Sequence, residues 1–159
     1  MTSANPFWDY SLNLYARPDV QDSCLCLQDD HQQDVNMLLY ACWQGSRGLE
    51  LSPQEFSAIQ QGLAEWREQL LLPARSLRRS LAKALPADHR MVNGARRLEL
   101  VLERWQQLQL YSWRVDHSTR GTPASTIQAN LLSLWRAAGE SEPPKELSAL
   151  SLSAQELLS

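Results

Sequence analysis

Acidic residues crowd one short polar segment of the chain. Asp29, Asp30, His31 and Asp34 lie close together, and carboxylates with an imidazole are ligand types that divalent metal ions accept. The spacing is not that of an established metal site, because the alternating ligands, central glycine and final glutamate of an EF-hand loop are missing, and no HExxH pair occurs. We therefore expect a solvated turn between two helices, in which Asp34 caps the second helix and no metal is bound.

The three cysteines, Cys24, Cys26 and Cys42, could serve a thiol enzyme if a histidine lay beside one of them. Cys24 and Cys42 fall on apolar helical faces, where cysteine usually acts as a small hydrophobic side chain, and Cys26 lies off the first of these faces. The odd number of cysteines and the single residue between Cys24 and Cys26 argue against a disulfide framework or a redox pair. We expect reduced thiols in the cytoplasm.

Other catalytic signatures are absent from the sequence. It has no nucleophile-elbow serine motif, no phosphate-binding glycine loop and no dinucleotide fingerprint. The amino-terminal residues lack the basic and apolar regions of a secretory signal. We therefore expect a protein that acts without catalysis, with no catalytic residue, no cofactor and no bound metal. A helical enzyme without a recognisable motif is the less favoured alternative.

Basic residues concentrate in the middle of the chain. The net charge is -3, but residues 1–62 carry -6, residues 63–120 carry +5 and residues 121–159 carry -2. On a helix, positions 75, 78, 79 and 83 share one face, because they are spaced by three and four. Seven cations of this region form the candidate interaction surface: Arg75, Arg78, Arg79, Lys83, Arg90, Arg96 and Arg97.

Three interpretations of this basic cluster stay open. The acidic residues of the same fold could neutralise it, it could bind another protein or a second copy of the chain, or it could bind RNA or DNA phosphates. Nucleic acid is the weaker alternative, because aromatic residues do not alternate with the basic ones and the helix-turn-helix-like spacing over residues 18–44 is acidic. No membrane contact is expected. The function that we expect is a protein-interaction, regulatory or adaptor module.

Helical periodicity accounts for nearly all of the chain. The sequence is rich in leucine and alanine and poor in β-branched residues, which favours helices over strands. Seven segments repeat apolar residues at spacings of three and four, and clear starts lie at Asn5, Asp34, Ser52 and Thr122. No strand pattern is visible. We predict an all-α fold, a single bundle of about six to seven helices.

Several boundaries and faces follow from the same patterns. Gly45 is expected to cap the helix that begins after Asp34, Pro73 to kink or end the next helix, and Asn93-Gly94 either to lie within the longest helix or to break it. The domain should span residues 1–139, followed by a flexible tail over residues 140–159 with a short helix from Ser153 at most. The longest helix should bury Met91, Ala95, Leu98, Leu102 and Trp105, and the first helix Trp8, Leu12 and Tyr15.

The first forty-five residues combine these signals in a specific order. In seven short pieces the chain resembles the opening of a small proteobacterial family of unknown function, DUF2390: Phe7-Trp8-Asp9, Leu14-Tyr15, Arg17-Pro18-Asp19-Val20, Cys24-Leu25, Leu27-Gln28, Asp34-Val35-Asn36 and Leu38-Leu39. Beyond Gly48 the likeness is general. The resemblance implies a helical, cytoplasmic bacterial protein, and it carries no activity, substrate or site residue.

Overall fold

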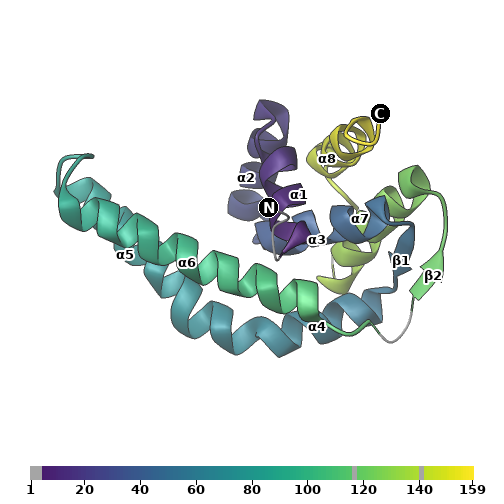
Figure 1. Ribbon diagram of the computed structural model, residues 1–159, viewed down its shortest axis with the longest axis horizontal. Coiled ribbons are helices and arrows are strands. Elements are labelled where there is room, and N and C mark those ends of the chain that lie inside the picture. The colour runs from purple at the N-terminus through teal and green to yellow at the C-terminus, as the bar shows by residue number, and fades with distance from the viewer. Residues whose placement is uncertain (1–4, 116–117, 140–141) are drawn as a thin grey trace.

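The computed structural model describes residues 5–115, 118–139 and 142–159. A π-helical segment, Arg67–Leu71, joins α4 to α5 without a break, so the helices of the described residues form seven continuous rods. The predicted all-α bundle is therefore confirmed, and Figure 1 shows its arrangement. The α-helices are α1 (Pro6–Tyr15), α2 (Pro18–His31), α3 (Val35–Ser46), α4 (Pro53–Trp66), α5 (Leu72–Ala84), α6 (Arg90–Ser112), α7 (Pro123–Ala137) and α8 (Lys145–Glu156).

Most helix starts lie where the capping signals predict them. The side chains of Asn5, Asp34 and Ser52 accept hydrogen bonds from backbone N–H groups in the first turns of α1, α3 and α4. Each of these bonds pairs a donor that a helix start would otherwise leave free. At α6 the cap is His89, whose Nδ1 accepts from the N–H of Met91 at 3.1 Å.

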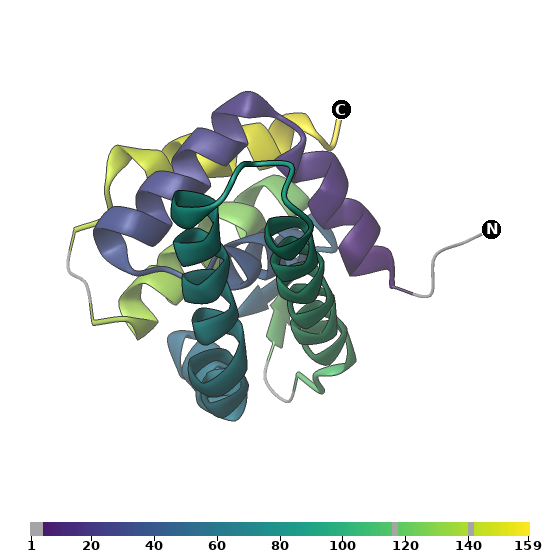
Figure 2. The ribbon, with the colours of Figure 1, turned by 90° about the vertical axis from the view of Figure 1, so that its left-hand side faces the viewer.

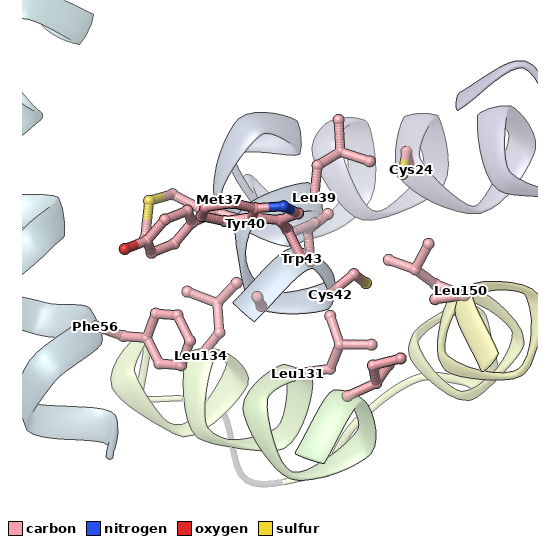
Figure 3. Packing of buried hydrophobic residues seen from close by; sticks show 14 of the residues in the cluster. Cys24, Met37, Leu39, Tyr40, Cys42, Trp43, Phe56, Leu131, Leu134 and Leu150 are labelled. Atoms are coloured by element: carbon pink, nitrogen blue, oxygen red, sulfur yellow. The ribbon is translucent and has the colours of Figure 1, made fainter. Parts of the chain in front are cut away.

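Helix α3 runs through the hydrophobic core. Ten of its twelve residues are buried, and α7 crosses it closely. Figure 3 shows Leu131 and Leu134 of α7 beneath Cys42 and Trp43 of α3. Gly45 lies inside α3 and does not cap it: a Cβ atom at Gly45 would lie 2.5 Å from the Cα atom of Ile127. Gly45 is thus required by the close approach of α3 to α7.

Two short strands interrupt the helical pattern. The strands β1 (Leu49–Leu51) and β2 (Ser118–Arg120) pair antiparallel, with Leu49 opposite Arg120. Asn130 of α7 holds β1 in place, because its Oδ1 accepts from the N–H of Leu51 at 2.8 Å and its Nδ2 donates to the carbonyl of Leu49 at 2.8 Å. The sequence predicts a loop over residues 117–121. His117 lies outside the described residues, and three-residue strands are too short to show a period.

The carboxyl-terminal helix α8 is missing from the prediction. Residues 145–156 form three helical turns in place of a flexible tail, while positions 140–141 lie outside the described residues. Leu147, Leu150 and Ala154 are buried against α2 and α7. The serines between these apolar residues hide the pattern in the sequence, because Ser151 and Ser153 are buried as well.

We predict that Leu150→Ala lowers the free energy of unfolding by about 2.5 kcal/mol, because it removes a fully buried side chain and leaves a cavity. Leu152→Ala on the same helix is the matched control, since Leu152 is 62% exposed and its truncation costs little. Urea unfolding of both variants measures the difference. Equal stability of the two variants would show that α8 does not pack on the core.

Helices α5 and α6 form an antiparallel hairpin that extends away from the other helices, and we call these two helices and the turn between them the arm (Figure 1). Figure 2 looks onto the end of the arm. Pro73 lies in the first turn of α5, directly after the π-helical segment. Proline cannot donate to the carbonyl four residues earlier, and a π-helical turn accommodates such a missing bond. No described helix is long and apolar enough to cross a bilayer.

Helix α6 continues through Asn93-Gly94, which settles the alternative left open by the sequence. Gly94 is exposed and has no atom within 4 Å of the position that a Cβ would take. The buried residues of α6 differ from the predicted stripe, because only Ala95 of that stripe is buried. The same correction applies to α1, which buries Phe7, Ser11 and Leu14 and exposes Leu12.

Candidate functional site

Two of the seven predicted surface cations face inward from the arm. Arg75 is only 7% exposed, and its Nη2 lies 2.8 Å from Oε1 of Glu103, while its Nε lies 3.4 Å from Oε1 of Glu99. Arg78 forms an ion pair with Glu99. Burial by itself lowers the pKa of Arg75, but the carboxylates of Glu103, Asp34 and Glu99 together outweigh it, so the pKa is raised. Arg75 therefore does not belong to an exposed surface. Its counterions are glutamates of α6, whereas the prediction of a basic face considered the basic residues alone.

The other five cations lie on the surface of the arm, and one of them, Arg79, is on the side that faces α1, α2 and α3. All five are exposed, and within the described parts of the chain none forms an ion pair shorter than 4.0 Å. They belong to both helices and lie toward the end of the hairpin. This set of exposed cations comprises Arg79, Lys83, Arg90, Arg96 and Arg97.

An apolar stripe runs along the exposed face of α6. Successive members are separated by seven, three, four and three residues, which places them on one side of the helix. Most of this stripe is the pattern that the sequence assigns to the core, and Val101 at 61% is its most exposed member. Trp105 also stacks on Trp66, with ring centroids 3.7 Å apart. The exposed stripe consists of Met91, Leu98, Val101, Trp105 and Leu108.

A groove of about 400 Å³ lies on the inner side of the arm, where it faces α1, α2 and α3. Its walls are mostly apolar, and Leu12, Leu25 and Leu100 are exposed around it. The ion pairs of Arg75 and Arg78 with Glu99 and Glu103 form one side. Polar residues from three helices also line it: Ser11 of α1, Asn36 of α3 and Gln107 of α6.

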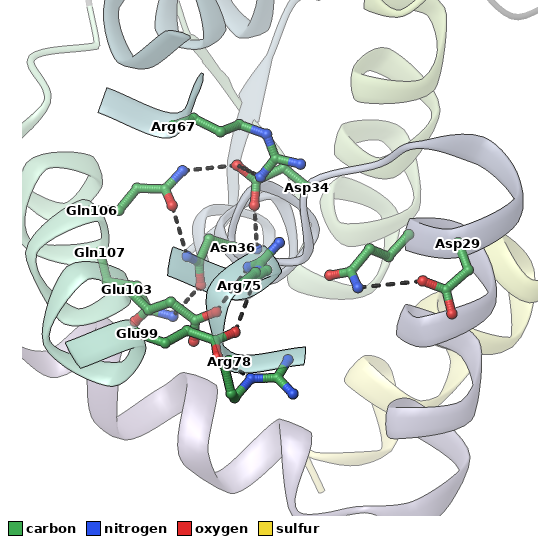
Figure 4. Close-up of polar contacts among 11 residues, drawn as sticks. Asp29, Asp34, Asn36, Arg67, Arg75, Arg78, Glu99, Glu103, Gln106 and Gln107 are labelled. Carbon is green, nitrogen blue, oxygen red and sulfur yellow. Dashed lines mark hydrogen bonds and ion pairs between the residues drawn. The ribbon is translucent and has the colours of Figure 1, made fainter. Parts of the chain in front are cut away.

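A network of buried polar side chains connects this groove to the start of α3 (Figure 4). The carboxylate of Asp34 accepts from the side chain of Gln106 at 2.8 Å and lies 3.0 Å from Nη1 of Arg67. Gln106 in turn accepts from Asn36 at 3.0 Å, and Asn36 accepts from Gln107 at 3.1 Å. The network joins α3 to α6 through residues that lie 70 to 72 positions apart, so no local pattern in the sequence reveals these pairs.

The structure disperses the acidic residues that the sequence raises as metal ligands. Asp34 is buried and caps α3, with its Oδ1 3.0 Å from the N–H of Asn36, whereas Asp29 and Asp30 lie exposed at the end of α2. The ring of His31 packs edge-on against Trp135. Across the described ranges, no three His, Cys, Asp or Glu side chains lie close enough together to hold a metal ion. The predicted polar turn is mostly helix, since α2 extends to His31.

The thiols lie in surroundings that keep them protonated at neutral pH. Burial raises the pKa of Cys24 to about 12 and raises that of Cys42 well above its ordinary value, as their core positions predict. Cys26 donates to a carboxylate oxygen of Asp30 at 3.3 Å, and this hydrogen bond is the main reason that its pKa rises to about 11. None of the three has the low pKa of an activated thiolate.

Comparison with known families identifies the chain. The model of a family described as a protein of unknown function, DUF2390, matches residues 6–110, about two thirds of the sequence. The chain belongs to the DUF2390 family. No curated protein and no solved structure matches it.

The DUF2390 match spans the groove and nearly all of the arm. Every residue that lines the groove lies between positions 8 and 107, inside the matched range. Seven of them belong to the short pieces that carry the resemblance of the first forty-five residues: Trp8, Tyr15, Leu25, Gln28, Val35, Asn36 and Leu39. Helices α7 and α8 lie outside the match, although both complete the core.

Proposed function

We propose that this DUF2390 chain is a cytoplasmic bacterial interaction module, which acts without catalysis and docks another protein on the outer face of its arm. The observation that carries the proposal is the exposed stripe of α6, since large apolar side chains in a row are costly to leave in water. The three free cysteines of the described residues support a reducing compartment. Regulatory and adaptor proteins work through such contacts.

The surface favours an acidic amphipathic helix as the docking element. The stripe spans residues 91–108 of one helix, roughly 26 Å at about 1.5 Å per residue, and such a length accommodates several turns of a partner helix. The exposed cations beside it would attract carboxylates on the polar side of that helix. The apolar contacts would supply the affinity, and the charges would supply the orientation and the rate of association.

Nucleic acid is the second candidate partner, because the five exposed cations have no carboxylate partners in the described residues. A protein that binds the phosphates of RNA or DNA would use these charges and would not need the exposed apolar stripe. For about five phosphate contacts, the affinity should fall by about two to three orders of magnitude between 50 and 200 mM salt. This dependence distinguishes the two partners.

We predict that the triple variant Lys83→Glu, Arg90→Glu, Arg97→Glu weakens partner binding at least about tenfold, because it reverses exposed charges of the arm and changes neither the groove nor the buried pair of Arg75. A second triple variant, Arg114→Glu, Arg120→Glu, Arg136→Glu, makes the same charge change at exposed positions elsewhere. Crosslinking and affinity purification from nuclease-treated lysate would identify the partner. Calorimetry with the purified partner would then compare the two variants.

Equal binding by the two triple variants would contradict the proposal. Two results together would assign the arm to nucleic acid instead. The first is that capture of the partner disappears when the lysate is treated with nuclease. The second is that binding to duplex DNA or single-stranded RNA shows the salt dependence given above. Leu98→Ser with Val101→Ser separates the two further. This pair should weaken a protein contact and leave phosphate binding unchanged.

A further inference from the structure

The buried network beside the groove has a defined direction. A carboxylate can only accept hydrogen bonds, so Asp34 must face the NH₂ group of the Gln106 amide. The carbonyl oxygen of Gln106 is then left to accept from the NH₂ group of Asn36. By the same reasoning, the oxygen of Asn36 accepts from the NH₂ group of Gln107. Each amide orientation is therefore set by the one before it, starting from a charge.

This chain of hydrogen bonds ends on an acceptor that has no donor. Oε1 of Gln107 is buried and has no hydrogen-bond partner among the described residues, and the same holds for Oγ of Ser11. Both residues line the groove, and they are only 2% and 4% exposed. A buried polar atom without a partner is costly, typically about 1 to 3 kcal/mol. The groove thus lies against one acceptor, Gln107 Oε1, and one hydroxyl, both unpaired.

The remaining lining limits the chemistry of a ligand. Two arginines, Arg75 and Arg78, are balanced by two carboxylates, Glu99 and Glu103, and a third arginine, Arg79, lines the groove at an exposed position without an ion pair among the described residues. The walls include apolar side chains such as Trp8, Leu39 and Leu100. A volume of about 400 Å³ is in the range of small-molecule sites. The two buried groups that lack partners, Gln107 Oε1 and Ser11 Oγ, are both uncharged, so an uncharged head on an apolar body matches the buried end of the groove.

We propose that the groove binds an uncharged amphipathic small molecule with an amide- or alcohol-type head. The head would donate an N–H or O–H to Oε1 of Gln107 and accept from the hydroxyl of Ser11, and its apolar body would lie along Leu12, Leu25 and Leu100. Gln107 Oε1 and Ser11 Oγ are closed to solvent, so side chains that line the groove must change rotamer before the head reaches them. The site is separate from the outer face of the arm.

A pair of matched probes tests the donor requirement. Octanamide carries an apolar chain, a carbonyl and an NH₂ group, whereas N,N-dimethyloctanamide keeps the chain and the carbonyl and has no donor. Titration of the full-length ¹⁵N-labelled protein with each compound, followed by NMR, measures both affinities. We expect octanamide to shift the side-chain NH₂ resonances of Gln107 and Asn36 saturably and to bind about tenfold tighter than its dimethyl analogue.

Two neighbouring substitutions test the location. Leu100→Trp fills the groove and should abolish octanamide binding, whereas Val101→Trp places the same side chain on the exposed stripe and should leave binding unchanged. Both positions are exposed, so both variants should fold, which circular dichroism would check. Gln107→Met should remove the preference for octanamide. Equal affinity of the two probes for the wild-type protein, no binding of either, or equal effects of the two tryptophans would overturn the proposal.

Discussion

Replacing Gly45 by alanine should lower the free energy of unfolding by about 4 kcal/mol, above the roughly 1 to 3 kcal/mol that overpacking usually costs. The added Cβ would lie 2.5 Å from the Cα and 2.6 Å from the backbone nitrogen of Ile127, and a backbone cannot move aside as a flexible side chain can. Separating α3 from α7 would also strain the hydrogen bond from the Thr126 hydroxyl to the Gly45 carbonyl, now 2.6 Å long.

Gly94→Ala provides the matched control in the same fold. Gly94 lies within α6, with nothing within 4 Å of the added atom, so alanine should raise the free energy of unfolding by about 0.5 to 1 kcal/mol through its higher helix propensity. Urea unfolding followed by circular dichroism measures both variants. Loss of less than about 1 kcal/mol at Gly45 would show that α3 and α7 do not approach this closely.

The second large effect is expected at Asn130, where a leucine of similar size should cost about 4 kcal/mol. The Asn130 side chain is fully buried, and it accepts from the N–H of Leu51 and donates to the carbonyls of Leu49 and Ala41. Leucine would leave three backbone groups, two of them fully buried, without this partner. The strand β1 and the middle of α3 would each lose their hydrogen bonds to Asn130 of α7.

Asn13→Leu makes the same chemical change at an exposed position of α1 and should alter the stability by less than about 0.5 kcal/mol. Thermal and urea unfolding would compare the two variants, and amide exchange at Leu51 would report the local loss. If Asn130→Leu proved as stable as Asn13→Leu, the buried tie between β1 and α7 would not exist as described.

Local signals in the sequence predict the helices well, because caps act over three or four residues. Asn5, Asp34 and Ser52 each hydrogen-bond within their own first turn, so their sequence neighbours suffice to identify them. The position of Gly45 shows where this reasoning fails. A glycine near a helix end resembles a cap in the sequence, and only the contact with Ile127, 82 positions later, reveals its packing role.

The exposed stripe of α6 is harder to predict, because a row of apolar residues has the same sequence pattern whether it faces a core or the solvent. The sequence therefore assigns most of this stripe to the interior, whereas Leu98 and Val101 are exposed. The counterions of Arg75 were missed for a related reason, since Glu99 and Glu103 lie on another helix of the hairpin. The groove depends on how five helices are placed, which no local pattern contains.

The π-helical segment before Pro73 gives the joint between α4 and α5 room for one additional residue. Such a segment holds one residue more than the α-helical turn it replaces, and each α-helical residue rotates the side-chain direction by about 100°. Deleting one residue between positions 67 and 71 would therefore leave an ordinary α-helical turn, and Arg75 would still face Glu99 and Glu103. The same deletion within α5 itself would rotate every preceding side chain of that helix away from α6, so the joint is the one place where the length of this helical rod can change without loss of the buried ion pairs.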